Sequence, residues 1–237
     1  MRPLHFSIGL LLFCLSGLQL FAQNCSAYFP MKVGDFFETT CYDNKGKVTS
    51  VSSSSVVEAQ KTIDGGLKVT VDIETKYAGI KKAVPSKQQY VCLNGELRVD
   101  LRTPLGLDQP EDSETAKHYL IYPSDLEVGM KLPDAELSYT YKDMNRHLDG
   151  SFDSERVSIS ITNHNRRVTG RESITTPVGT YSCLVIEEDF LSYDNRGGKI
   201  SYQIKTWLAP GVGTLRTEIT DNGKPFCSYV MTKSSLK

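Results

Sequence analysis

The stretch that decides the fold is Ile174–Tyr229, which reads ITTPVGTYSCLVIEEDFLSYDNRGGKISYQIKTWLAPGVGTLRTEITDNGKPFCSY. Four runs of alternating apolar and polar residues are separated by Thr-Pro-Val-Gly, Asp-Asn-Arg-Gly-Gly, Ala-Pro-Gly-Val-Gly and Asp-Asn-Gly. Alternation with a period of two is typical of strands with one buried face, and Asn and Gly tolerate the positive φ angles of tight turns. The stretch therefore predicts consecutive antiparallel strands joined by hairpins.

The same alternation recurs through the rest of the chain. It is found at 36–42, 48–57, 67–74, 137–141, 157–161 and 200–204. A meander of eight to ten such strands has one apolar face, which a flat single sheet would leave in water. The sheet must curl on itself, pack on a second sheet or be covered, and strand twist makes curling the natural solution. We therefore predict an all-β fold, with a single strongly curved antiparallel meander sheet.

One segment, Thr103–Pro133, interrupts the strand rhythm. It contains four prolines, an acidic cluster from Asp108 to Glu114 and several apolar residues, and a short helix is predicted near Asp112–Lys117. Long connections inside compact domains are usually functional or form a packed cover. We expect this segment, a ligand or both to fill the concave side of the sheet.

The N-terminus has the pattern of a secretory signal peptide, predicted for residues 1–22. Arg2 supplies the positive start, and Ile8–Phe21 is an apolar run too short to span a bilayer comfortably. A membrane anchor helix is the alternative, but Ser16, Gly17 and Gln19 dilute the run. Residues 23–237 are then predicted to form a single all-β domain.

The predicted mature chain is periplasmic or extracellular and soluble after cleavage. A lipoprotein needs a small residue before the acylated cysteine, whereas Asn24 precedes Cys25, so the sequence shows no lipoprotein motif. The whole chain has 27 basic and 28 acidic residues, and removing Arg2 changes the formal charge from −1 to −2. That balance provides no basic field for nucleic acid. No later apolar run approaches membrane length.

Cysteine number limits the disulfides without assigning them. The mature cysteines are Cys25, Cys41, Cys92, Cys183 and Cys227. An oxidising compartment permits disulfides, and five cysteines form at most two within one chain. No C-x-x-C spacing is present, which disfavours redox catalysis and a zinc ribbon. We expect at least one buried free cysteine, and the pairing stays open.

No catalytic, metal or cofactor motif is found, and no ligand-binding residue can be named. The mature histidines His118, His147 and His164 lack patterned partners, so each is predicted to be a surface or strand-exposed residue. Asp143–Ser154 superficially resembles a calcium loop, but its sixth and twelfth positions are leucine and serine.

The adjacent acids Glu187, Glu188 and Asp189 alternate across a strand, so neighbouring carboxylates are predicted on opposite faces. Trp207 is predicted to pack in the core or at a sheet edge, with sugar stacking as the alternative. Tyr139, Tyr141 and Tyr202 are predicted on the apolar faces of their strands, where they suit a core or the lining of an amphipathic cavity.

Four segments together resemble a family of exported proteins from Gram-negative bacteria, the TapB-like proteins, also described as a domain of unknown function. The segments are Cys25–Gly34, Val128–Ala135, Val168–Cys183, and Trp207 with Gly211–Gly213. The resemblance implies a half-open β-barrel similar to lipoprotein-carrier folds. It implies no catalytic residues.

These observations leave three functional hypotheses. The first is a binding module whose concave face receives an apolar or lipid-like small molecule. The second is an assembly partner that offers a sheet edge to another envelope protein. An enzyme ranks last, because it would need acidic and histidine side chains that converge in a wet pocket.

Overall fold

The structure, a computed structural model, describes residues 28–29, 31–103, 116–146 and 152–235. Its strands in chain order are β1 (Phe36–Asp43), β2 (Val48–Lys61), β3 (Leu67–Tyr77), β4 (Val84–Leu93), β5 (Glu96–Asp100), β6 (Tyr119–Pro123), β7 (Ala135–Arg146), β8 (Phe152–Thr176), β9 (Gly179–Asp194), β10 (Lys199–Ala209), β11 (Gly213–Asp221) and β12 (Lys224–Ser234). A 3₁₀ turn, η3 (Ala116–His118), precedes β6.

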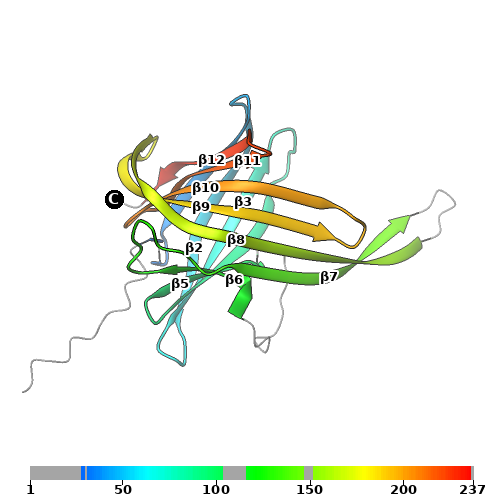
Figure 1. Ribbon diagram of the computed structural model, residues 1–237, viewed down its shortest axis with the longest axis horizontal. Coiled ribbons are helices and arrows are strands. Elements are labelled where there is room, and N and C mark those ends of the chain that lie inside the picture. Colours follow the sequence, from blue (N-terminus) through cyan, green and yellow to red (C-terminus); the bar gives the residue numbers. More distant parts are fainter. Residues whose placement is uncertain (1–27, 30, 104–115, 147–151, 236–237) are drawn as a thin grey trace, which may run out of the picture.

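All of these strands belong to one antiparallel sheet in the order β6-β5-β4-β3-β2-β1-β12-β11-β10-β9-β8-β7. Figure 1 shows β7–β10 in front and β2 and β3 crossing behind them in another direction, so the sheet curls on itself. The predicted all-β fold and curved antiparallel meander are confirmed. The predicted signal peptide and Cys25 lie outside the described residues.

The described sheet has twelve strands, more than the eight to ten expected. Two short strands account for much of the difference. β5 follows a tight turn, and β6 lies inside the segment predicted as a cover and pairs with β5 from Asp100 to Glu96. Strands of five residues show too little alternation to stand out in a sequence.

Two-residue turns give the meander its tight hairpins. Asn94 and Gly95 connect β4 to β5 with φ angles of 52° and 78°, and Asn222 and Gly223 connect β11 to β12 with 48° and 74°. Positive φ at both central positions defines the turn whose twist matches that of paired strands. The Asn-Gly pairs in the sequence thus fix two of the hairpins.

The barrel is nearly closed, with one unsealed seam between the edge strands β6 and β7. These strands follow one another in the chain but lie at opposite ends of the sheet order. The segment that joins them crosses to β8, where Lys131 forms an isolated antiparallel bridge with Arg167. Arg166 also donates from Nη1 to the carbonyl oxygen of Ile121 on β6, at 3.4 Å.

The main core fills one part of the barrel interior. Its buried members come from β2–β5 on one side, from β8–β10 on the other, and from two connecting segments: Tyr28, Met31, Val56, Val69, Val71, Cys92, Leu97, Leu126, Leu132, Val168, Leu184, Ile186 and Leu208. Leu126 and Leu132 lie in the predicted cover, which therefore does contribute to the filling. Tyr28 and Met31 fill it from the N-terminal side, a contribution the sequence did not reveal.

The predicted helix near Asp112–Lys117 lies mostly outside the described residues, and Ala116–His118 forms the 3₁₀ turn. Tyr119–Pro123 belongs to the sheet and not to a cover. The prediction for Thr103–Pro133 was thus correct for its apolar C-terminal part and wrong for the strand within it. Backbone pairing with β5 satisfies the hydrogen-bonding groups of β6, which a loose cover would leave unpaired.

Candidate functional site

A cavity of about 500 Å³ lies across the concave face of the sheet. Its lining includes Gln88 and Tyr90 from β4, Thr217 from β11 and Tyr229 from β12. In the sheet order β4 and β11 are separated by β3, β2, β1 and β12, so only the barrel interior places them around one space. The cavity is also lined by Phe29, Phe37, Thr39, Val212, Thr214, Leu215, Arg216 and Met231.

A smaller cavity of about 150 Å³ adjoins the first. It is enclosed by β4–β6 on one side and β9–β11 on the other, through Leu97, Val99, Leu120, Tyr122, Ile186, Thr206 and Leu208, with Tyr28. Phe29, Tyr90 and Thr214 line both cavities. Phe29 stacks on Tyr90 with ring centroids 3.8 Å apart, so this aromatic pair stands where the two spaces meet.

The lining combines apolar surface with a few fixed polar groups. The Gln88 side-chain amide donates to the carbonyl oxygen of Asp100 at 2.6 Å, which holds its orientation. Burial raises the pKa of Tyr90 and of Tyr122, so both phenols keep their protons at neutral pH. Sites for small molecules typically have this mixture of apolar walls and a few oriented polar groups.

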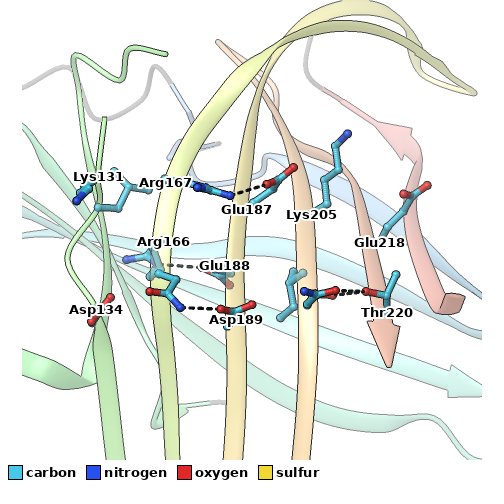
Figure 2. Close-up of a pocket in the computed structure, with 14 residues that line it drawn as sticks. Lys131, Asp134, Arg166, Arg167, Glu187, Glu188, Asp189, Lys205, Glu218 and Thr220 are labelled. Atoms are coloured by element: carbon cyan, nitrogen blue, oxygen red, sulfur yellow. Dashed lines mark hydrogen bonds and ion pairs between the residues drawn. The ribbon is translucent and has the colours of Figure 1, made fainter. Parts of the chain in front are cut away.

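A β-bulge in β8 turns Arg166 into the barrel interior. The register passes from His164 opposite Asp189 to Arg167 opposite Glu187, so two residues of β8 oppose Glu188 alone. Asn165 in this bulge has a φ angle of 54°, a left-handed conformation that asparagine tolerates better than most residues. The bulge places Arg166 and Arg167 on opposite faces of the strand, as Figure 2 shows.

The Arg166 guanidinium is fully buried and connects three parts of the barrel. Its Nε donates to Oε2 of Glu188 at 2.8 Å, and the two side chains are 0% and 9% exposed. Its Nη1 donates to the carbonyl oxygen of Pro133 at 2.6 Å. The guanidinium carbon lies 5.0 Å from the centre of the Tyr122 ring.

Charge is balanced within this buried group. The other carboxylate oxygen of Glu188 accepts a hydrogen bond from the Asn163 amide at 3.0 Å. Burial lowers the pKa of Arg166, but Tyr122 and Glu188 outweigh burial and the net direction is upward. The guanidinium therefore stays charged. Arg166 bonds to Ile121 on β6 and to Pro133, which precedes β7, so its side chain links the two sides of the seam within the barrel.

A larger hollow of about 920 Å³ lies against the charged residues of β8–β11 (Figure 2). Arg167, Glu187, Lys205 and Glu218 are successive cross-strand neighbours and form a row of alternating charge. Arg167 pairs with Glu187 at 3.6 Å, and the Asn165 amide donates to Asp189 at 2.7 Å. Because these charges neutralise one another, the row presents no concentrated field for an ionic ligand.

The predicted alternation of the three acids is confirmed. Glu187 meets Arg167 in the charged hollow, whereas Glu188 meets the buried Arg166. Asp189 faces the side of Glu187 and lies 4.0 Å from His164.

The prediction of exposed histidines was wrong for His118, which is only 8% exposed and packs on the ring of Tyr119, with centroids 4.2 Å apart. His164 is partly exposed, and His147 lies outside the described residues. His118 is the last residue of the 3₁₀ turn before β6, and its burial could not be predicted from the residues next to it in the sequence. Within the described ranges, no group of three or more His, Cys, Asp or Glu residues could hold a metal ion.

Trp207 is a packing residue, as predicted. It is 5% exposed in a second core cluster with Cys183, Val185 and Leu215. Its indole N–H donates to Glu172 at 2.7 Å. Cationic groups of Lys205 and Arg216 lie over its ring, at 4.7 and 5.5 Å from the centroid. The ring therefore offers no open platform for sugar stacking.

The described cysteines include three thiols and one disulfide member. Cys41 and Cys183 are buried free thiols, which confirms that expectation, and Cys227 is a partly exposed one. Cys92 is disulfide-bonded. Burial, with Cys41 beside it, raises the pKa of Cys227 to about 11. Cys25 lies outside the described residues.

The residues that shape this site carried no recognisable signal in the sequence. Arg166 sits in the run Asn163–Arg167, which reads as an ordinary polar strand, and its burial follows from the bulge at Asn165. Gln88 and Tyr90 meet Thr217 and Tyr229 only after the sheet curls. The run of six polar residues from Thr162 to Arg167, which breaks the alternation of β8, was the one available hint of the bulge.

The sequence profile of the DUF3108-like family matches residues 32–231. This chain belongs to the DUF3108-like family. No functionally curated protein matches it. No helix in the described ranges is long and apolar enough to cross a membrane.

Two solved structures resemble this member of the family. One, from Bacteroides fragilis, is provisionally described as an exported protein with a YmcC-like fold. It is 18% identical, with a TM-score of 0.65 over 89% of this chain and 100% of that chain. The other, from Parabacteroides distasonis, is provisionally described as a lipoprotein, with 21% identity and a TM-score of 0.65 over 88% and 99%. At these identities the likeness establishes the fold alone, and neither description names a ligand or a reaction.

Proposed function

We propose that this protein is an exported, non-catalytic binding protein that holds an apolar or amphipathic small molecule inside its barrel. The supporting observation is the cavity of about 500 Å³ that spans the concave face between β4 and β11. Ligand pockets typically measure about 300–1,000 Å³ and have mostly apolar walls. At about 30 Å³ for each water-sized group, this space holds a chain of roughly 15 such groups.

The first experiment uses protein purified from the cell envelope. Native mass spectrometry should show a bound small molecule, and the stripped protein should bind the apolar fluorophore N-phenyl-1-naphthylamine. Thr217→Phe places a ring in the cavity and should weaken fluorophore binding at least tenfold. Thr220→Phe makes the same change on the same strand in the charged hollow and should leave binding unchanged.

Absence of a co-purified molecule together with no fluorophore binding would refute the proposal. Equal effects of the two substitutions would show that the fluorophore binds elsewhere on the protein. A correctly folded Thr217→Phe protein, recognised by an unchanged far-ultraviolet circular dichroism spectrum, is required for the comparison.

The proposed protein is exported and carries no lipid anchor in its mature form. The TapB-like resemblance and the signal peptide predicted at residues 1–22 support export, and Asn24 before Cys25 supports a mature protein without a lipid anchor. Cells labelled with radioactive palmitate test the anchor directly. Label recovered on the protein, and lost in Cys25→Ser, would overturn the unanchored form.

The second candidate is assembly through the sheet edge. β7 lies at one end of the sheet order and pairs with β8 alone, so within the described residues its outer edge has no strand partner. An unpaired edge can accept a strand from a second copy of this chain. Sedimentation that shows a monomer at every concentration, with rapid amide exchange along β7, would leave this candidate without support.

A further inference from the structure

We infer that the bound molecule carries an uncharged hydrogen-bond-accepting group, such as an ester or amide, which binds at Tyr122 and Arg166 while its apolar chain lies toward Phe29 and Tyr90. This inference rests on the proposed function and specifies the class of ligand that the cavity takes.

The first observation is an unused donor in a buried charged group. Nη2 of Arg166 has no hydrogen-bond partner among the described residues, although the side chain is 0% exposed. Its Nε and Nη1 atoms are both engaged. Leaving a buried charged donor unsatisfied is costly, so such an atom calls for an acceptor that the chain itself does not supply.

The second observation is that the guanidinium lies over a residue that lines a cavity. The guanidinium carbon lies 5.0 Å from the centre of the Tyr122 ring, and Tyr122 lines the cavity of about 150 Å³. Phe29 and Tyr90 continue from that cavity into the larger one. A molecule with its polar end at Tyr122 therefore has the aromatic rings of Phe29 and Tyr90 beside the next part of its length.

The third observation selects an uncharged acceptor over a carboxylate. Glu188 already neutralises Arg166 through a hydrogen bond of 2.8 Å, and Asn163 satisfies its second oxygen. A ligand carboxylate would bury a second negative charge beside Glu188, and an unpaired buried charge is strongly unfavourable. The charge row around Arg167 and Glu187 adds no net positive field from the far side of β8 and β9.

The phenol of Tyr122 can reinforce the same preference. Burial raises its pKa, so the hydroxyl remains protonated at neutral pH and can donate to an oxygen acceptor. Tyr122 lines this space, and the guanidinium of Arg166 lies over its ring. An ester or amide carbonyl accepts from both donors without adding charge.

The test compares three chains of equal length by displacement of N-phenyl-1-naphthylamine from the stripped full-length mature protein. Methyl decanoate should bind about tenfold more tightly than decane, since a hydrogen bond to a charged group is involved. Decanoate at pH 7.5 should bind more weakly than methyl decanoate. Tyr122→Phe should reduce the advantage of the ester over decane several-fold, and Tyr193→Phe, the same change at an exposed site on β9, should not.

A second variant keeps the result interpretable if the buried pair also supports folding. Arg166→Met with Glu188→Met removes both charges together and should abolish the advantage of the ester while decane still binds. Equal affinity of ester and decane in the unaltered protein would refute the inference and indicate a water at Nη2. Tighter binding of decanoate than of the ester would refute the uncharged acceptor. Failure of the fluorophore and decane to bind at all would instead refute the proposed function.

Discussion

Replacing Arg166 by methionine should destabilise the barrel more than any neighbouring substitution on β8. The guanidinium is 0% exposed and joins β8 to Glu188 on β9, to Pro133 before β7 and to Ile121 on β6. Removing one partner of a buried ion pair leaves the other charge uncompensated and typically costs about 3–5 kcal/mol. For a domain of this size, that corresponds to a fall of roughly 6–20 °C in Tm.

The double variant Arg166→Met/Glu188→Met separates the charge from the packing. The double variant leaves no unpaired carboxylate in the core, because Glu188 is removed together with Arg166. Most of the stability lost in Arg166→Met should therefore return. The carbonyl oxygens of Ile121 and Pro133 still lose their donor, which leaves a deficit of about 1–2 kcal/mol. The double variant should therefore be about 2–3 kcal/mol more stable than Arg166→Met alone.

Urea denaturation followed by Trp207 fluorescence and by far-ultraviolet circular dichroism measures these free energies of unfolding. Arg167→Met is the matched control, because Arg167 is the next residue, pairs with Glu187 at 3.6 Å and has a side chain that is 63% exposed. It should cost at most about 0.5 kcal/mol. A similar loss for Arg166→Met and Arg167→Met, or additive effects of Arg166→Met and Glu188→Met, would refute the role of a buried fastening at the seam.

Three further predictions concern the bulge, an acid-sensitive contact and the thiols. Asn165→Ala should cost about 1–2 kcal/mol in urea denaturation because of its φ of 54°, whereas Asn165→Gly should be nearly neutral; the reverse order would exclude strain. The Trp207 indole N–H, and then Lys205, hold the pKa of Glu172 below its ordinary 4.5. A lowered carboxyl pKa adds stability that is present above the unfolded-state value and is lost as pH falls through the folded one, so Trp207 fluorescence should change with a midpoint below 4.5, and Glu172→Gln should remove that step. In the native protein at pH 8, Cys41, Cys183 and Cys227 should react very slowly with iodoacetamide, because the first two are buried and the pKa of Cys227 is about 11. After unfolding without reductant, peptide mapping should find these three alkylated and Cys92 unmodified, whereas alkylated Cys92 would contradict its disulfide.

The edge of the barrel connects stability with the proposed function. The cavity is bounded by strands that belong to one continuous sheet, and among the described strands β6 and β7 are the two ends of the order and form no hydrogen-bond ladder with each other. Arg166 lies at that contact and beside Tyr122, which lines the smaller cavity. A substitution that weakens the seam should therefore also alter access to the interior, and thermal stability and fluorophore binding should change together.

Local sequence determined most of the fold of this protein. The alternation in 67–74 and 200–204 specified strands, and the Asn-Gly pairs at 94–95 and 222–223 specified hairpin turns, because positive φ angles are a property of the residues themselves. The one-sided apolar strands also required burial of their apolar face, and strand twist favoured a curled sheet as the way to achieve it. Short strands such as β5 and β6 escaped detection because five residues show too little periodicity.

The site depended on tertiary structure for a different reason. Gln88 and Thr217 lie far apart in the sequence and face one cavity only because the curvature of the sheet brings β4 and β11 together. Arg166 is buried because one extra residue in β8 reverses the direction of its side chain, and Glu188 receives it because alternation turns that carboxylate inward. Backbone periodicity is encoded residue by residue, whereas the cavity and its buried charge arise from register and curvature, which are set by the whole sheet at once.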